Sequence, residues 1–395
     1  MLFTTLQILG WLIVGALIFL VAATIGFDFG AGILSKFVGK TDYEKRAVIN
    51  AVAPTWDGNQ VWFITAGGAL FAIWPQVYAS SFSGLYIAIL LVLWGLFLRP
   101  VAFEYRKKID SQTWRTTWDW MLLLGSAIPI IVMGVAIGNL YLGLPIAYDD
   151  TARLIYGEIT NGQYQSMWYT LVMLLTPFAI LFGIFALVMV LMHGSAYCAM
   201  RTDGVLRQRF KKILKTCASL YILLFIVAAI WLLFKQGYQW TPTDKLTHYS
   251  DAMLHPWTSA IVSRDNSWYA NFALHPWMII APLLALIAAL LVLRFNAKNR
   301  DVAAFFASMA SILGAVFTVG FTLFPFIMPS STNGQFSLTI YNASSSQLSL
   351  IGIEIAAVIL LPIIFTYTLF VYRKMWAKGR RISAEEVQQH SHEMY

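Results

Sequence analysis

Long runs of apolar residues, nearly free of charge, recur along the whole chain. We identify nine of them, at residues 8–34, 52–74, 79–98, 118–143, 166–192, 214–234, 268–293, 302–328 and 349–372. Each run is long enough for a helix that crosses a hydrocarbon core about 30 Å thick. No alternation of apolar and polar residues over about ten positions recurs, so the pattern predicts helices rather than a barrel. We therefore expect an all-α polytopic membrane protein with about nine transmembrane helices packed in bundles.

Composition favours a membrane domain over a soluble enzyme with an anchor. The 395 residues are 59% hydrophobic and only 12% charged, and the mean hydropathy is +0.67. A soluble protein carries about 25% charged residues. No linker or second domain stands out, so we expect one membrane domain over residues 1–395, with a short cytoplasmic tail at residues 373–395. No basic residue precedes Lys36, so the first run lacks the charged start of a signal peptide and is expected to be a retained span.

The basic residues alternate with the predicted spans. All but four of the 27 lie after the first, third, fifth and seventh runs or in the tail. The exceptions are Arg153, Lys235, Lys245 and Arg264. By the positive-inside rule we expect the N-terminus outside and the C-terminus in the cytoplasm. The net charge of +8 therefore indicates topology and contact with membrane lipids, not a surface for nucleic acid.

A polar block opens the second run. Within residues 54–63, the side chains of Trp56, Asp57, Asn59 and Gln60 stand where an apolar segment begins. A carboxylate within a membrane helix costs about 2.5–3.5 kcal/mol on insertion, so such groups should face protein, water or a proton path. A simpler interpretation is a helix N-terminus, where Asp57 would favour the positive end of the helix dipole. The residues alone leave both interpretations open.

Further ionisable side chains gather near the predicted inner surface. Asp28 lies in the inner part of the first run, and Asp119 opens the fourth. Arg99 closes the third run, and Glu104 follows it by five residues. We expect these groups, with Asp57, to share one level of the membrane. They could take up protons or cations from the cytoplasm, tuned by Arg99. They could equally form an ion pair and helix-start carboxylates that hold four spans together.

Small residues surround Asp28. Gly26 and Gly30 form a small-xxx-small pattern, which lets two helices approach closely. Asp28 shares its helix face with Gly32 and Ser35, at i+4 and i+7. We therefore expect this face inside a helix bundle rather than towards lipid.

The chain offers few residues that bind metals. Its two cysteines, Cys198 and Cys217, do not have the spacing of a zinc or iron–sulfur site. Of the six histidines, only His275 falls within a predicted span, and His193 is expected at an inner helix end. A bis-His haem needs two histidines at one depth, which the predicted spans do not offer. A haem bound by His275 and a methionine stays open. We expect that this chain by itself ligates no haem and no other metal.

Several motifs resemble subunit II of the cytochrome bd quinol oxidases. The motifs occur in the family's order and cover nearly the full length of the chain. They are residues 26–30 (Gly-Phe-Asp-Phe-Gly), 56–62 (Trp-Asp-Gly-Asn-Gln-Val-Trp), 64–72, 97–100 (Phe-Leu-Arg-Pro), 324–331 and 345–348. The Trp-Asp-Gly-Asn-Gln block is the most specific of them.

The resemblance implies a function that the residues alone do not give. The family reduces O₂ to water with electrons from quinol and protons from the cytoplasm, in the bacterial cytoplasmic membrane. The resemblance places haems b and d and the site of quinol oxidation on the larger subunit I, which subunit II stabilises. Small single-span subunits are further expected partners. Some members also bind a quinone in subunit II as a structural lipid.

The resemblance also assigns roles to single residues. It implies proton delivery through Asp57 and Asp28, and it maps inner acidic positions to Glu104 and Asp119, with Arg99 beside them. The residues Trp56, Asn59 and Gln60 would support that path. Many relatives carry a second Asp just before the Gly-Phe-Asp block, where this chain has Thr24 and Ile25. A path that needs the extra carboxylate is in doubt for this chain.

Two functions of other classes compete with the oxidase subunit. One is a secondary transporter that couples a substrate to protons through Asp28 and Asp57. The other is a purely structural assembly subunit without an ion path. An oxidase subunit requires a larger haem-bearing partner, whereas a transporter should work as a colourless single chain.

Overall fold

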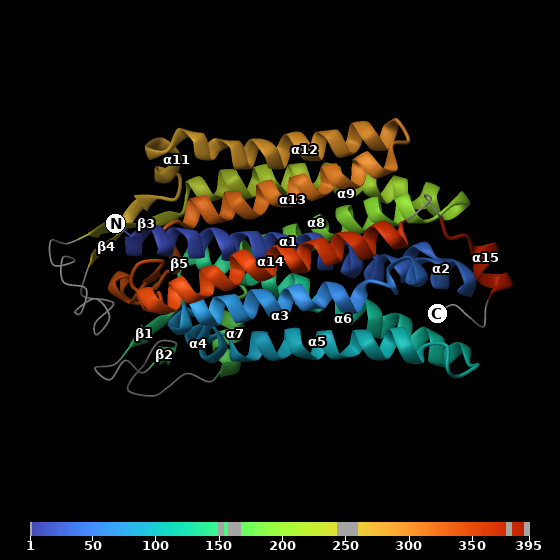
Figure 1. Cartoon of the computed structure of the whole chain (residues 1–395), viewed down its shortest axis with the longest axis horizontal. Coiled ribbons are helices and arrows are strands. Elements are labelled where there is room, and N and C mark those ends of the chain that lie inside the picture. Colours follow the sequence, from blue (N-terminus) through green and yellow to red (C-terminus); the bar gives the residue numbers. More distant parts are fainter. Residues whose placement is uncertain (1, 149–153, 157–166, 243–259, 377–380, 391–395) are drawn as a thin grey trace.

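The computed structural model describes residues 2–148, 154–156, 167–242, 260–376 and 381–390. Its long helices run side by side along one axis (Figure 1). The helices are α1 (Leu2–Val38), α2 (Asp42–Val52), α3 (Trp56–Ile73), α4 (Pro75–Gly84), α5 (Tyr86–Tyr105), α6 (Gln112–Leu142), α7 (Met167–Met173), α8 (Pro177–Arg201), α9 (Gly204–Leu233), α11 (Ala270–Leu274), η2 (Pro276–Ile279), α12 (Ile280–Ala297), α13 (Asp301–Leu323), η3 (Gly334–Phe336), α14 (Gln347–Met375) and α15 (Ala384–Gln389).

Three short antiparallel strand pairs complete the described elements. They are β1 (Ile146–Tyr148) with β2 (Leu154–Tyr156), β3 (Gln236–Pro242) with β4 (Ala260–Ser267), and β5 (Phe326–Met328) with β6 (Leu338–Thr339). The strands lie at the same end of the bundle as the start of α1, whereas α2 and α15 lie at the opposite end (Figure 1). We call the first the strand end and the second the basic end, because α1, α8, α12 and α14 all finish there with a basic residue in the last turn.

The prediction of a polytopic all-α membrane protein is confirmed. Among the described residues, eight helices are long and apolar enough to cross a membrane. The pair α3 and α4, bent by 117° at a short break, brings the number to nine. The small sheets were not predicted, because strands of two to eight residues carry no pattern that stands out beside the apolar runs.

Several helix boundaries differ from the prediction. The predicted span 79–98 begins later, at Tyr86, and continues to Tyr105 as α5. The predicted span 166–192 is split into α7 and α8, because Pro177 starts a new helix. Helices α5 and α8 therefore extend further towards the basic end than expected, to Tyr105 and Arg201. This shift moves the residues near those ends deeper into the bundle.

Helix α2 was not predicted. It is short, and its Thr41 forms a capping box with Glu44, in which each residue bonds to the other's backbone. Its apolar face, with Val48 and Val52, is buried against the bundle. The tail packs on the same end, since Val387 of α15 is buried in the same apolar cluster.

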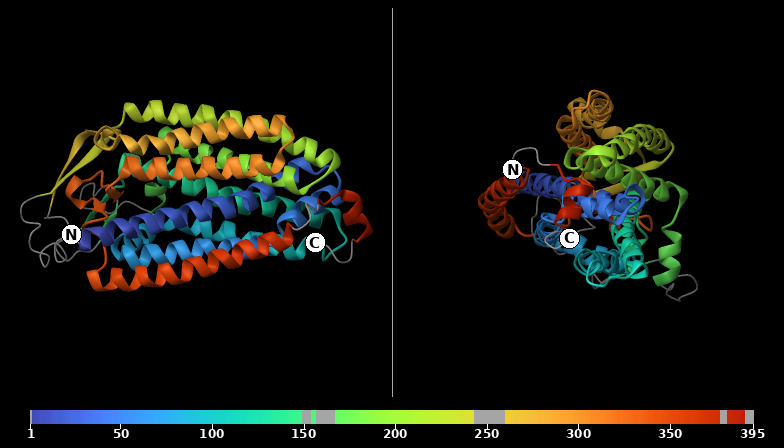
Figure 2. Two further views of the ribbon diagram at one scale, coloured as in Figure 1. Left: turned by 45° about the horizontal axis from the view of Figure 1, so that its top comes forward. Right: turned by 90° about the vertical axis from the view of Figure 1, so that its right-hand side faces the viewer.

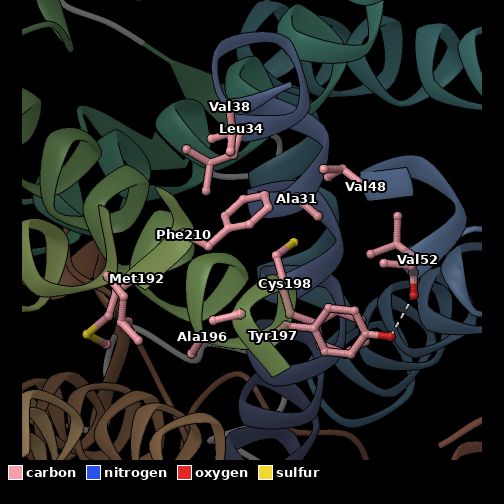
Figure 3. Packing of buried hydrophobic residues seen from close by; sticks show 14 of the residues in the cluster. Ala31, Leu34, Val38, Val48, Val52, Met192, Ala196, Tyr197, Cys198 and Phe210 are labelled. Atoms are coloured by element: carbon pink, nitrogen blue, oxygen red, sulfur yellow. Dashed lines mark hydrogen bonds between the residues drawn. The ribbon is translucent and has the colours of Figure 1, made fainter. Parts of the chain in front are cut away.

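Figure 3 shows part of this cluster at the basic end. Phe210 of α9 and Cys198 of α8 point towards Ala31 of α1, and the Tyr197 hydroxyl donates a hydrogen bond of 2.8 Å to the carbonyl of Ala51 in α2. The cluster therefore joins α1, α2, α8 and α9 in one core.

Helices α1 and α8 touch through their backbones. A Cβ on Gly30 would lie 2.3 Å from the carbonyl oxygen of Val190 and 2.9 Å from Cα of Gly194. Only glycine allows this approach. The expectation that the small-residue face around Asp28 lies inside a bundle is confirmed.

Helix α14 has a different environment. It lies at the edge of the bundle (Figure 2), and Leu350 is its only buried residue. Large apolar side chains such as Val358 and Ile363 are exposed on it. A helix of this kind must face lipid or another protein.

Candidate functional site

An ion pair between α1 and α5 lies inside the bundle. The Nη2 atom of Arg99 is 2.8 Å from Oδ1 of Asp28, and both side chains are 0% exposed. Arg99 also donates from Nη1 to the hydroxyl of Ser126 in α6. The guanidinium lies 3.7 Å from the ring centre of Phe29. Three helices thus surround one buried carboxylate and one buried cation.

This ion pair is poorly supplied with hydrogen bonds. Among the described residues, neither oxygen of Asp28 has a partner in hydrogen-bonding geometry, and neither do Nε and Nη2 of Arg99. Burying charges is costly unless they are paired and hydrogen-bonded. The two groups therefore keep free capacity to bond to water or to exchange a proton.

The carboxylate of Asp119 has a contrasting environment. Its Oδ2 accepts from Lys45 Nζ at 2.7 Å, and its Oδ1 accepts from Arg106 Nε at 2.7 Å. Arg106 also contacts Asp42 at 2.8 Å. Burial alone would lower the pKa of Arg106, but the hydrogen bonds and charges of Asp119 and Asp42 outweigh it and raise that pKa. Asp119 therefore ties α2, α5 and α6 together at the basic end.

The expected ionisable cluster is thus divided into two levels. Asp119 and Ser126 are seven residues apart on α6, which is about 10 Å along a helix axis. Ser126 contacts Arg99, so the Asp28–Arg99 pair lies deeper than Asp119. Arg99 was expected to close its span, but α5 continues past it through Pro100. The expectation of a single level was wrong for this reason.

Asp57 and Glu104 lie on the surface of the chain. Asp57 is exposed in the first turn of α3, and Glu104 is exposed in the last turn of α5. The ring of Trp56 stacks on Phe103 with 5.3 Å between centroids, and Phe103 lies 5.5 Å from the Arg99 guanidinium. Trp56, the sequence neighbour of Asp57, therefore reaches the buried pair only through Phe103 among the described contacts.

The amide block continues from Asp57 into the bundle. Asn59 is buried, and its Oδ1 accepts from the hydroxyl of Tyr372 in α14. Among the described residues, Nδ2 of Asn59 and Nε2 of Gln60 have no hydrogen-bond partner. The ring of Tyr372 lies 6.2 Å from that of Phe27, the neighbour of Asp28. Tyr372 was not a predicted site residue, and no local motif marks it.

His193 is a second residue whose position was not predicted. It lies within α8, fully buried, and not at an inner helix end, because α8 continues to Arg201. Its Nδ1 is 2.7 Å from Ser308 Oγ and its Nε2 is 2.9 Å from the carbonyl oxygen of Ala23. His275, expected within a span, is exposed between α11 and η2.

The buried histidine His193 is not free to ligate a haem. Both of its ring nitrogens are already engaged, so axial ligation through either one would break a buried hydrogen bond. Cys198 and Cys217 are buried free thiols. In the part of the chain that the structure describes, no group of three or more His, Cys, Asp or Glu side chains could hold a metal ion.

Comparisons with known proteins identify the family. The model of the family "Cytochrome bd terminal oxidase subunit II" matches residues 6–375. The chain is 40% identical to "Cytochrome bd-I ubiquinol oxidase subunit 2" of Escherichia coli (strain K12), over 100% of this chain and 99% of that protein. It is 31% identical to "Cytochrome bd ubiquinol oxidase subunit 2" of Bacillus subtilis (strain 168), over 88% and 90% of the two chains.

The fold comparison agrees. A chain from "The structure of bd oxidase from Geobacillus thermodenitrificans" superposes with a TM-score of 0.68 at 14% identity, over 95% of this chain and 99% of that one. No finding favours the transporter or the purely structural subunit. The chain belongs to the cytochrome bd terminal oxidase subunit II family and is part of a respiratory quinol oxidase complex, which reduces oxygen.

Proposed function

We propose that this chain delivers protons from the cytoplasm to the oxygen-reducing centre of the complex. The observation that carries this is the Asp28–Arg99 pair. It is fully buried, and Oδ1 of Asp28 lies 2.8 Å from Arg99 Nη2, but neither carboxylate oxygen meets hydrogen-bonding geometry with a described residue. A buried carboxylate in the membrane whose oxygens are not fully hydrogen-bonded is typical of a proton path.

The proposed path starts at Asp57. This exposed carboxylate can exchange protons with water at the basic end. From there, the amide of Asn59 and the hydroxyl of Tyr372 provide hydrogen-bonding groups towards the interior. Asp28 is the next carboxylate inward, and Arg99 compensates its charge. Water can bond to the free amide atoms of Asn59 and Gln60 and link the steps.

The other two carboxylates take different roles in this proposal. Glu104 is exposed at the basic end, where its charge can attract protons towards Asp57. Asp119 holds helices together, because both of its oxygens accept hydrogen bonds from cations. We therefore place Asp119 outside the path of the proton.

The proposed orientation puts the basic end in the cytoplasm and the start of α1 outside. Lys36, Arg201, Arg294 and Arg373 stand in the last turns of α1, α8, α12 and α14, and all of these helices finish at that end. Such a bias is the usual sign of the cytoplasmic side of a bacterial membrane. Reporter fusions after Lys212 and after Trp240 should give opposite compartments, and the same compartment for both would contradict it.

The proposed partner is a larger subunit I that holds haems b and d and oxidises quinol. The engaged ring nitrogens of His193, the buried histidine, support a haem site on the partner. Helix α14 exposes nearly all its apolar side chains, and α3 beside it buries only Asn59, Trp62 and Ile73. These two helices are the proposed contact with subunit I. Small single-span subunits and lipid can cover the remaining apolar surface.

A bound quinone is a further expectation. A cavity of about 240 Å³ lies between α1, α6, α8 and α13. Its walls are almost wholly apolar, with Trp11, Met189 and Phe317 among them. Such a cavity suits an isoprenoid chain. We propose it as the place of a structural quinone or lipid, without a part in electron transfer.

The experiment that tests proton delivery replaces Asp57. Asp57→Asn keeps size and hydrogen bonding but removes the transferable proton. The expected result is slower oxygen consumption with quinol, at normal haem content. Asp110→Asn is the matched control, since Asp110 is another exposed carboxylate of the basic end, and it pairs with Arg115 at the surface. Unchanged turnover in Asp57→Asn would remove that residue from the path.

A further inference from the structure

A cationic pocket opens at the basic end, and its lining residue Trp376 stacks on Tyr372 of the proposed proton path. It has a volume of about 770 Å³ and lies where α8 and α14 end and α13 begins. Three of its lining side chains are arginines, namely Arg201, Arg300 and Arg381. Among the described lining residues, Asp301 is the acidic one. The volume falls within the range of small-molecule sites.

The carboxylate of Asp301 is already occupied. Its Oδ2 accepts from Arg207 Nε at 2.7 Å and from Arg381 Nη2 at 2.8 Å. Arg381 also lies 3.6 Å from Asp203. The two carboxylates near the pocket are therefore neutralised by Arg207 and Arg381. Among the described lining residues, the positive charge of Arg300 is left over.

Arg300 is the main free charge. Among the described residues, its side chain makes no ion pair and no hydrogen bond, and it is exposed to the pocket and solvent. Its backbone is fixed, because its N–H donates to the carbonyl of Phe295 at 2.9 Å and the preceding Asn299 adopts a positive φ of 57°. Asn296 anchors the same turn through the carbonyl of Lys211 at 2.9 Å. The turn thus presents Arg300 from a rigid base.

The start of α13 adds to the attraction for an anion. Val302 and Ala303, in its first turn, line the pocket. The first N–H groups of a helix have no partner within the helix, and the helix dipole is positive at that end. This helix has 23 residues, so the partial charge at its start is fully developed. It reinforces the guanidinium groups but does not define the site by itself.

We propose that this pocket binds a phosphate-bearing anion, in the form of a phospholipid headgroup or a free phosphate. Guanidinium groups match phosphate oxygens in geometry and charge. The pocket lies at the ends of helices long enough to span a membrane, where lipid headgroups are expected, and the aromatic residue Trp376 lines it. Binding would join α13 to Arg381 and so fix the tail against the bundle.

The test uses the intact oxidase complex, purified and stripped of lipid in detergent. Its melting temperature is measured against added phosphatidylglycerol, phosphatidylcholine or inorganic phosphate. Phosphatidylglycerol should stabilise the wild type more than phosphatidylcholine. In Arg300→Gln, the phosphatidylglycerol concentration for half the effect should rise about fivefold, since one cation near a lipid surface contributes about 1 kcal/mol. Arg300→Lys keeps the charge, so the phosphatidylglycerol concentration for half the effect should rise less than in Arg300→Gln.

Arg294→Gln is the matched control. Arg294 is an exposed arginine in the last turn of α12, at the same end of the bundle but outside the pocket. Its dependence on phosphatidylglycerol should equal that of the wild type. If inorganic phosphate protects as well as the lipid, and competes with it, the ligand is free phosphate; if only the lipid protects, it is a headgroup. Equal shifts in Arg300→Gln and Arg294→Gln, or equal protection by both lipids, would overturn the proposal.

Discussion

Two buried carboxylates in this chain have opposite surroundings. Each carboxylate oxygen of Asp119 accepts a hydrogen bond from a cation, Lys45 or Arg106. The residue thereby connects three helices at the basic end. Asp28 has one cation, Arg99, and neither of its oxygens is in hydrogen-bonding geometry with a described residue. Both sites bury charge, but among the described residues only the Asp119 carboxylate has both oxygens hydrogen-bonded to cations. The difference indicates that Asp119 serves structure, whereas Asp28 is available for proton transfer.

The largest expected effect comes from separating the charges of the deep pair. Asp28→Leu leaves Arg99 buried without its counter-ion, which costs about 3–5 kcal/mol, so little haem-containing complex should assemble. Replacing both residues, as Asp28→Leu with Arg99→Met, removes both buried charges and should restore assembly. Turnover should stay low in this double variant. The measurements are haem content and oxygen consumption of the purified complexes, and recovered turnover would show that the pair is only structural.

A smaller effect is expected at Asp119. Asp119→Asn removes the charge that Lys45 and Arg106 share, and should destabilise the complex by about 1.5–3 kcal/mol. At matched haem, the turnover should be that of the wild type. Thermal unfolding and oxygen consumption test the two parts separately. Lower turnover in folded Asp119→Asn would place this carboxylate back in the proton path.

The hydroxyl of Tyr372 gives a finer test of the same contrast. Tyr372→Phe removes only the donor to Asn59, so stability should fall by about 0.5–1.5 kcal/mol. Turnover should fall as well, because the hydroxyl belongs to the proposed path. Tyr367→Phe is the control, since Tyr367 is 68% exposed on the same helix. If both variants keep full turnover, the path does not pass through Tyr372.

The smallest effect concerns Glu44 at the basic end. Burial alone would raise its pKa, but hydrogen bonds from the backbone of Lys40 and Thr41 and from Arg209 outweigh it and lower the pKa from the usual 4.5. Since the folded-state pKa is the lower one, the stabilisation is present above pH 4.5 and is lost as the pH falls through the folded-state value. Tm should therefore fall more steeply on acidification in the wild type than in Glu44→Gln. Parallel curves would contradict this.

The apolar runs were sufficient to predict the bundle, and the glycines around Asp28 predicted close packing against another helix, which the structure shows to be α8. Composition can do this because a membrane span must be long and apolar, and a backbone contact needs small residues. The depth of each charge was harder to predict. Arg99 and His193 both lie deeper than expected, since α5 continues through Pro100 and α8 continues to Arg201.

Sequence brought Asp28 and Arg99 together, but other contacts between distant segments could not be predicted. Tyr372 and Asn59 are 313 residues apart in the chain, and no local pattern joins them. The cations around Asp119 were likewise out of reach, because Lys45 lies on the short helix α2, which is too polar to stand out beside the membrane spans. Sequence could therefore select the candidate residues but could not divide them between structure and proton transfer.

The central claim is that Asp28 carries protons and Asp119 does not. The most direct test compares Asp28→Asn with Asp119→Asn in proteoliposomes, at matched haem, and measures oxygen consumption with quinol together with membrane potential. We predict that Asp28→Asn loses most of both, because asparagine keeps the shape but cannot transfer the proton. Asp119→Asn should keep both once the complex is folded. Equal turnover and equal potential in the two variants would contradict the claim.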